Sequence, residues 1–148
     1  MQNRFVVVTV AALCAVAGIA GCSSTPANSP QPPGALPPGT AEVTVNGQSA
    51  GTTRAVQCTQ DSWTHTIMTG DNKSGAKVVV ETGKSINATS VVITNISDFT
   101  GTVLENNIGK AEASMIGTTF RVTGTAQGST TQNPNQVSTA NFEVKANC

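Results

Sequence analysis

Apolar and polar residues alternate along most of the chain beyond Glu42, with the period of two that is typical of half-buried β-strands. The clearest stretches are "TTFRVTGTA" at residues 118–126 and "ANFEVKANC" at residues 140–148, and the second places Cys148 on its inward face. "EVTVNG", at residues 42–47, adds the Asn-Gly signal of a tight hairpin turn. Further strands are predicted at residues 50–58, 63–69, 76–82, 88–96, 99–105 and 110–116.

No window beyond Glu42 keeps apolar residues at helical spacing between helix start and stop signals. Many short strands separated by Gly, Asn, Asp and Ser are typical of an antiparallel β-sandwich or a small barrel. The sequence therefore predicts an all-β fold of that kind.

The N-terminus follows a different pattern. An unbroken run of mainly apolar residues from Phe5 to Ala20 follows Arg4 and ends in small residues before Cys22. This arrangement is typical of a secretory signal peptide, and the run is short for a membrane span of roughly 20 residues. Ile19-Ala20-Gly21-Cys22 resembles the bacterial lipobox, in which the cysteine thiol receives a diacylglycerol and a peptidase cuts before it. The alternative is an ordinary secretory signal with a cysteine near its cleavage site.

A proline-rich segment separates this cysteine from the first strand. Ser23 to Ala41 holds six of the seven prolines of the chain, and such a composition favours extended, disordered structure. At about 3.1 Å per residue it could hold a domain at most ~60 Å from a membrane. The predicted organisation is a signal peptide at 1–21, a lipidated cysteine with its linker at 22–41, and one β domain at 42–148.

Charge and aromatic content exclude several partners. Only 11% of the residues are charged, the net charge is zero, and no basic block is present, so we expect no nucleic-acid partner. With 3% aromatic residues and no Tyr, a stacking platform for sugars is also disfavoured. The acidic residues are scattered and His65 is the only histidine, so we predict no metal site and no cofactor.

The four cysteines fall into two groups. Cys14 lies in the predicted signal peptide and Cys22 in the predicted lipidation site, which leaves Cys58 and Cys148 as a pair in an exported chain. A disulfide between them would tie an early strand to the last one. The alternatives are two free thiols or a metal site, and a metal site would need ligand companions that the sequence does not supply.

One motif suggests an enzyme. "GQSAG", at residues 47–51, fits the G-x-S-x-G pattern of a hydrolase nucleophile at Ser49. A strand-like segment follows it instead of a helix, and His65 comes only 16 residues later. We therefore predict no enzymatic activity and no catalytic residues, and interpret His65 as a structural residue beside Trp63.

Several motifs together resemble the mycobacterial 19 kDa lipoprotein antigen family over residues 22–148. They are the lipobox, the proline-rich stalk, "VTVNGQ" followed by a cysteine about ten residues on, "FRVTGTAQG", and the closing "FEVKANC". The resemblance implies S-diacylglycerol and N-acyl lipidation at Cys22, a disulfide between Cys58 and Cys148, and O-glycosylation at Thr25 or Thr40. It further implies a surface antigen whose acyl chains are recognised by host Toll-like receptors, with no established enzymatic activity.

These features lead to one functional hypothesis and one alternative. The hypothesis is a non-catalytic binding or presentation module, anchored by covalent lipid on the outer face of the cell membrane or at the envelope surface, with host receptors as partners. The sequence identifies no natural ligand. The alternative is a carrier of lipid or another hydrophobic ligand, suggested by small residues on the predicted sheet faces: Ala111, Ala113, Gly124 and Ala126.

Overall fold

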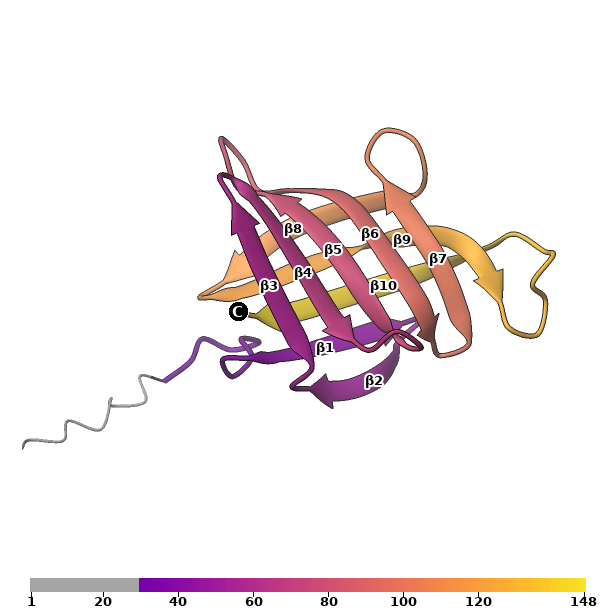
Figure 1. Cartoon of the computed structure of the whole chain (residues 1–148), viewed down its shortest axis with the longest axis horizontal. Helices are drawn as coiled ribbons and strands as arrows, with labels where there is room; N and C mark the ends of the chain where they lie inside the picture. Colours follow the sequence, from indigo (N-terminus) through magenta and orange to yellow (C-terminus); the bar gives the residue numbers. More distant parts are fainter. Residues whose placement is uncertain (1–29) are drawn as a thin grey trace, which may run out of the picture.

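The computed structural model describes residues 30–148, which form ten antiparallel β-strands and no helix (Figure 1). The strands are β1 (Thr40–Val45), β2 (Gln48–Thr53), β3 (Val56–Asp61), β4 (Thr64–Gly70), β5 (Gly75–Glu81), β6 (Asn87–Ile96), β7 (Phe99–Leu104), β8 (Lys110–Ile116), β9 (Thr119–Thr130) and β10 (Ser138–Asn147). They pair in the order β2-β1-β10-β9-β7-β6-β5-β4-β3, and β8 pairs with β9. The predicted all-β antiparallel fold is confirmed.

The strands form two layers that enclose the core. In Figure 1, β3 to β7 lie in front and cross the strands β1, β9 and β10 behind them. Alternation along each strand turns one set of side chains inward, so the core is built mainly from Val, Ile, Ala and Phe. Its largest fully buried apolar side chains are Ile67, Ile93, Val45, Val78, Val80, Val91, Val103 and Val122.

The two layers are joined at β9, which exchanges one partner for another along its length. Its first part, Thr119–Thr125, pairs with β8, and its last part, 127–130, pairs with β7. Gly124 lies at this change of partner, and a Cβ atom there would stand 1.9 Å from the carbonyl oxygen of Lys110. Gly128 is equally close to the carbonyl oxygen of Thr100. Glycine is therefore required where neighbouring backbones approach β9 this closely.

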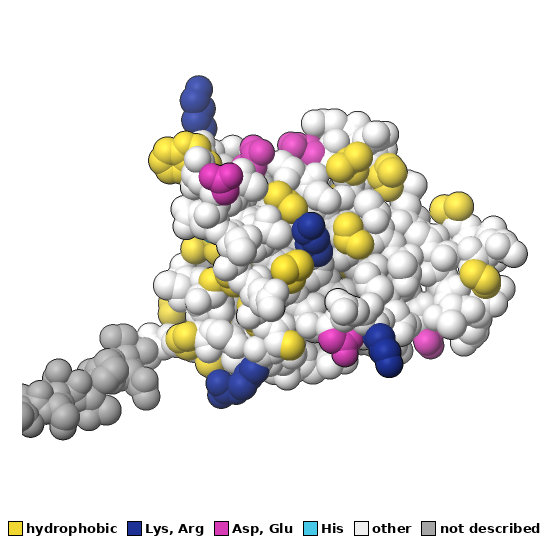
Figure 2. Space-filling view, in the orientation of Figure 1, with side chains coloured by type: hydrophobic (Ala, Val, Ile, Leu, Met, Phe, Trp, Pro, Cys, Tyr) yellow, Lys and Arg dark blue, Asp and Glu magenta, His cyan; other side chains and the backbone are white. Residues whose placement is uncertain are grey.

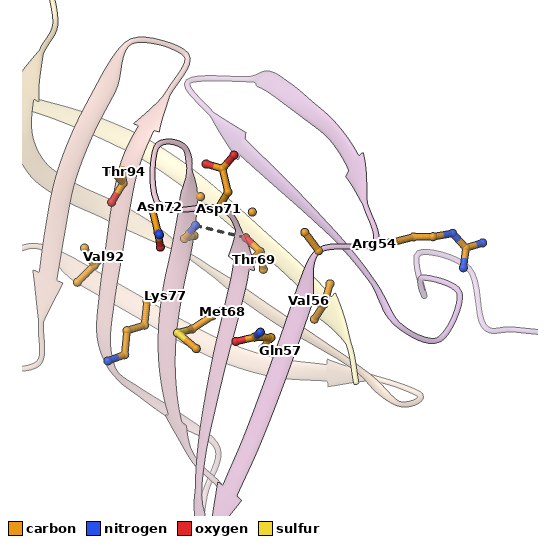
Figure 3. A pocket seen from close by; sticks show the side chains of 14 residues that line it. Arg54, Val56, Gln57, Met68, Thr69, Asp71, Asn72, Lys77, Val92 and Thr94 are labelled. Atoms are coloured by element: carbon orange, nitrogen blue, oxygen red, sulfur yellow. Dashed lines mark hydrogen bonds between the residues drawn. The ribbon is translucent and has the colours of Figure 1, made fainter.

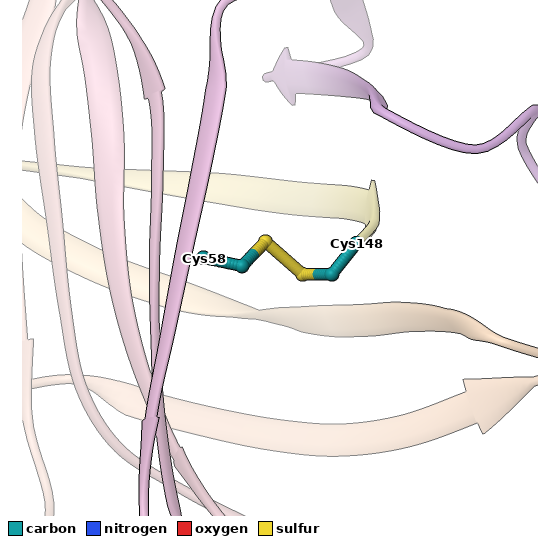
Figure 4. Close-up of a disulfide and its surroundings, with 2 residues drawn as sticks. All are labelled: Cys58 and Cys148. Carbon is teal, nitrogen blue, oxygen red and sulfur yellow. A yellow bond between two sulfur atoms is a disulfide. The ribbon is translucent and has the colours of Figure 1, made fainter.

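A disulfide joins the edge strand β3 to the end of β10. Cys58 of β3 is bonded to Cys148, just beyond β10, with 6.0 Å between their Cα atoms and 90 residues between them in sequence (Figure 4). Both residues have the inward parity of their strands, as predicted for Cys148, yet both are exposed. Cys58 is exposed because β3 ends the strand order, so that no further strand among residues 30–148 pairs with it.

The predicted single strand at residues 50–58 is wrong. The structure divides it into β2 and β3, which lie at the two ends of the strand order. The break has no Gly or Pro: the Ala55 N–H donates to Thr53 Oγ1 at 3.0 Å, and the Ala55 carbonyl accepts the N–H of Gly70. A threonine hydroxyl that accepts a backbone N–H gives a turn with a weak sequence signal.

The domain begins before the predicted boundary at Glu42. β1 starts at Thr40, and Ala41 is fully buried. Further upstream, the Leu36 N–H donates to Thr119 Oγ1 at 2.9 Å and the Leu36 carbonyl accepts Asn147 Nδ2 at 2.6 Å. The end of the predicted linker is thus bound to the domain, whereas the predicted signal peptide, Cys22 and the linker up to residue 29 lie outside the described residues.

Replacing either bridged cysteine, as in Cys58→Ser or Cys148→Ser, should lower the melting temperature by roughly 10 °C or more. In the chain-entropy model a loop of this length contributes of order 4 to 5 kcal/mol to stability. Thermal unfolding followed by circular dichroism measures the shift, with Thr59→Ser on the same strand as the control. Unchanged melting of both cysteine variants would contradict this role of the bridge.

Gly124→Ala should destabilise the fold strongly, because the added Cβ would collide with the Lys110 carbonyl and overpacking typically costs about 1 to 3 kcal/mol. Gly83→Ala is the matched control, since a Cβ there meets nothing within 4 Å. Denaturant titration should show a lower midpoint for the first variant only. Equal midpoints would refute the close approach at Gly124.

Candidate functional site

Ser49 lies on β2 and is not built into a catalytic group. Its Oγ donates to Glu42 Oε1 at 2.9 Å and accepts the Gly51 N–H at 3.0 Å, and the residue is exposed. The segment is a strand within a hairpin, whereas a nucleophile elbow needs a sharp strand-to-helix turn. His65 lies on β4 in the other layer. The two residues that suggested a hydrolase are not brought together.

His65 packs between the layers, as expected for a structural residue. Its Nε2 lies 3.1 Å from Thr82 Oγ1, and its ring centroid lies 5.1 Å from that of Phe120 on β9. Trp63, which alternation placed on the same face, instead sits in the β3–β4 turn and is 68% exposed. Sequence reasoning missed the contact with Thr82, because Thr82 follows β5 and meets His65 only through strand pairing.

Thr40 does not fit its predicted role as a glycosylation site. It is 4% exposed at the start of β1, and its Oγ1 donates to the Pro37 carbonyl at 2.6 Å. A sugar on this oxygen would have to replace that hydrogen bond and enter buried space. The other candidate, Thr25, and the predicted lipidation site, Cys22, lie outside the described residues.

A shallow groove of about 660 Å³ runs over the outer side of β3 to β6 (Figure 3). Asp71 at its end is already engaged, since one carboxylate oxygen accepts the N–H groups of Lys73 at 2.7 Å and Ser74 at 2.9 Å. These two hydrogen bonds hold the pKa of Asp71 below its usual range, and the bond from the Lys73 N–H has the larger effect. This carboxylate therefore shapes the β4–β5 turn and offers little to a ligand.

A second open groove, of about 780 Å³, lies beside β8. Ala111 and Ala113 line it, together with acidic Glu105 and Glu112. Ala126 is fully buried in the core, and the close backbone approach described above accounts for the glycine at 124. Packing thus explains Gly124 and Ala126, two of the four small residues that suggested a carrier. The carrier hypothesis stays a prediction that rests on Ala111 and Ala113.

The outward side chains of β3 to β7 form a face with little charge. Figure 2 looks onto this face and shows separate yellow side chains around a dark-blue one. Met68, Val92 and Leu104 are 40%, 37% and 43% exposed on it. Lys77 lies between Met68 and Val92 in the strand register. Alternation along each strand predicts this face, but not which strands lie beside one another.

The described part of the chain has two further properties. Within residues 30–148, no three His, Cys, Asp or Glu residues gather as a metal site. The same range contains no helix that is long and apolar enough to cross a membrane.

Comparison with known proteins decides the family. A model of the Mycobacterium 19 kDa lipoprotein antigen family matches residues 34–148. The chain belongs to the mycobacterial 19 kDa lipoprotein antigen family. The predicted resemblance is confirmed, and the matched residues correspond closely to the ordered domain, from just before Leu36 to Cys148.

Relatives of the family cover the whole chain. A putative lipoprotein of Mycobacterium indicus pranii is 37% identical over 149 residues, covering 100% of both chains. A putative lipoprotein of Mycobacterium avium subsp. hominissuis is 36% identical, with 100% of this chain and 97% of the relative covered. The probable lipoprotein LppE of Mycobacterium tuberculosis is 30% identical over the full length of both. The name lipoprotein implies a lipid anchor in each of these relatives.

Ser49→Ala should leave any ester hydrolysis by the purified protein within about twofold of the parent rate, because the hydroxyl lies on a strand beside the Glu42 carboxylate alone and His65 lies in the other layer. A p-nitrophenyl ester assay measures the rate, and Ser114→Ala, another exposed strand serine, serves as the control. A tenfold loss with Ser49→Ala alone, in a protein that keeps its fold, would make this serine a nucleophile.

Proposed function

We infer that this family member is an exported lipoprotein antigen, anchored by acyl groups on Cys22, whose β domain is a non-catalytic binding or presentation module on the outer face of the membrane. The observation that carries this proposal is the match of the family to residues 34–148, with a lipobox cysteine a short way upstream. The catalytic alternative has no support, since Ser49 is bonded only to Glu42 and Gly51 among the described residues.

The anchor supplies the membrane partner. One acyl chain gives only marginal membrane binding, whereas two or three, at about 0.8 kcal/mol per buried methylene, hold a protein firmly. S-diacylglycerol and N-acyl groups on Cys22 would therefore fix the location of the whole chain. The low charge of the domain adds no attraction to anionic lipid that could replace them.

The reach of the anchor is shorter than the linker composition predicts. Leu36 and Gly39 are tied to the domain by hydrogen bonds, Leu36 to Thr119 and Asn147, and the Gly39 N–H to the Asn147 carbonyl at 2.8 Å. Thirteen residues then lie between Cys22 and Leu36, and even a fully extended chain of that length spans only about 50 Å. The domain is therefore held nearer to the membrane than the whole predicted linker would allow.

Recognition by the host is assigned to the acyl chains. Protein interfaces concentrate binding energy in buried aromatic and Arg anchors. The surface of this domain offers Trp63 as its one exposed large aromatic side chain among residues 30–148. Toll-like receptors would thus bury the lipid, with Thr25 as the remaining candidate for O-glycosylation near it.

Cys22→Ala should release the protein from the membrane fraction by tenfold or more, remove the mass of the acyl groups, and abolish most stimulation of receptor-bearing cells. Cys14→Ala is the matched control, because this cysteine leaves with the predicted signal peptide. Cell fractionation, intact mass and a reporter-cell assay give the three readouts.

Two outcomes would overturn parts of this function. Retention of Cys22→Ala in the membrane fraction would show that another group anchors the chain. Full receptor stimulation by the unlipidated protein, free of contaminating lipopeptide, would make the β domain itself the ligand.

A further inference from the structure

The outer surfaces of the two layers differ in whether their charged side chains form ion pairs. On the back layer, Arg121 Nε lies 2.6 Å and Lys145 Nζ 3.7 Å from Glu143 Oε1, so its central charges are paired. On the front layer, Lys77 and Glu81 of β5 are exposed, and neither forms an ion pair with any of residues 30–148. Unpaired charges lie there among exposed apolar side chains.

These groups stand in a symmetric order along the middle strand of the front layer. β5 turns Lys77, Val79 and Glu81 outward, with the intervening Val78 and Val80 buried. Alternate residues of a strand are about 6.6 Å apart, so the cation and the anion lie at equal distances on either side of Val79.

The neighbouring strands extend this order into three rows across the layer. Met68 and Val92 flank Lys77, Thr66 and Ser90 flank Val79, and Thr64 and Asn87 flank Glu81. Leu104 ends the middle row, through its pairing with Ser90. We call the outward side chains of β4 to β7 the front face.

We propose that the front face is a docking surface for the front face of a second copy of this chain. The two-fold axis lies in the plane of the interface, perpendicular to the strands, and passes over Val79. The two facing β5 strands therefore run in opposite directions. Lys77 of each copy then faces Glu81 of the other, which gives two ion pairs and leaves no charge over. Such self-complementarity is what an isologous two-fold interface requires.

The same operation brings apolar side chains together. Val79 and Leu104 lie in the row on the axis and face their own row in the second copy. Met68 comes opposite Thr64 of the second copy, next to the Trp63 that its β3–β4 turn leaves exposed. Methionine and aromatic residues are enriched in protein interfaces, and sheets pack face to face at about 10 Å.

A membrane suits this face less well than a second copy. Lys77 is the only cation among its outward residues, while Glu81 adds an acidic group, so an anionic bilayer gains no net attraction. Confinement of many copies to one surface would raise their effective concentration and favour the pair.

Cross-linking of the full chain tests the proposal directly. Val79→Cys puts a thiol on the axis, and a short bis-maleimide applied to the cell fraction that holds the chain should give at least tenfold more dimer than Thr44→Cys. Thr44 is the matched control, since it is equally half-buried but faces outward on the back layer. Ser90→Cys, beside Val79 in the same row, gives a second site that should behave like it.

Charge reversal then tests the register. In the Val79→Cys background, Lys77→Glu or Glu81→Lys alone should reduce the dimer at least fivefold, and both together should restore it to within twofold. Lys110→Glu on β8 is the control and should leave it unchanged. Retention of the Cys58–Cys148 bond checks that each variant is folded.

Three results would overturn the proposal. The first is cross-linking of the Val79→Cys and Ser90→Cys variants that is no greater than that of Thr44→Cys. The second is a cross-linked band whose mass differs from twice that of the chain. The third is a double charge swap that fails to restore the dimer. Because the cross-linking is read in whichever fraction holds the chain, failure of the lipid anchor would be seen separately.

Discussion

The covalent bond between Cys58 and Cys148 closes a sheet that its hydrogen bonds leave open. Nine strands pair in one continuous order that ends at β3 and β2, and only at the β7–β9 pairing does the backbone ladder join the front and back layers. The core between them is made of small and medium side chains, with three buried Phe and no buried Trp. A small apolar core supplies limited stability, so the staple at the open edge carries a large share.

Local rules predicted much of this fold. Strand alternation gave the inward residues of β9 and β10, and the Asn-Gly pair gave the β1–β2 turn, where both residues have positive φ. What failed was either weakly encoded or non-local. The break between β2 and β3 depends on the Thr53 hydroxyl, and the early start of β1 at Thr40 depends on its pairing with Asn147 at the far end of the chain.

The β domain has three regions with different chemistry: its interior, the outer surface of its back layer and the outer surface of its front layer. The interior is filled by the apolar residues that hold the two layers together. On the back layer Arg121 and Lys145 both lie beside Glu143. The front layer presents apolar side chains together with Lys77 and Glu81, which form no ion pair within residues 30–148. The sequence predicted the anchor at Cys22 from a local motif. It could not predict the front face, because strand order decides which outward residues become neighbours.

Hydrogen–deuterium exchange on the full chain, with the disulfide intact and after reduction, tests most directly whether the bridge holds the open edge. Reduction should speed exchange of the β3 and β4 amides tenfold or more, while β9, still paired with β7, β8 and β10, should change least. Equal protection of β3 in the two forms would contradict the account, since hydrogen bonds and packing alone would then keep the layers closed.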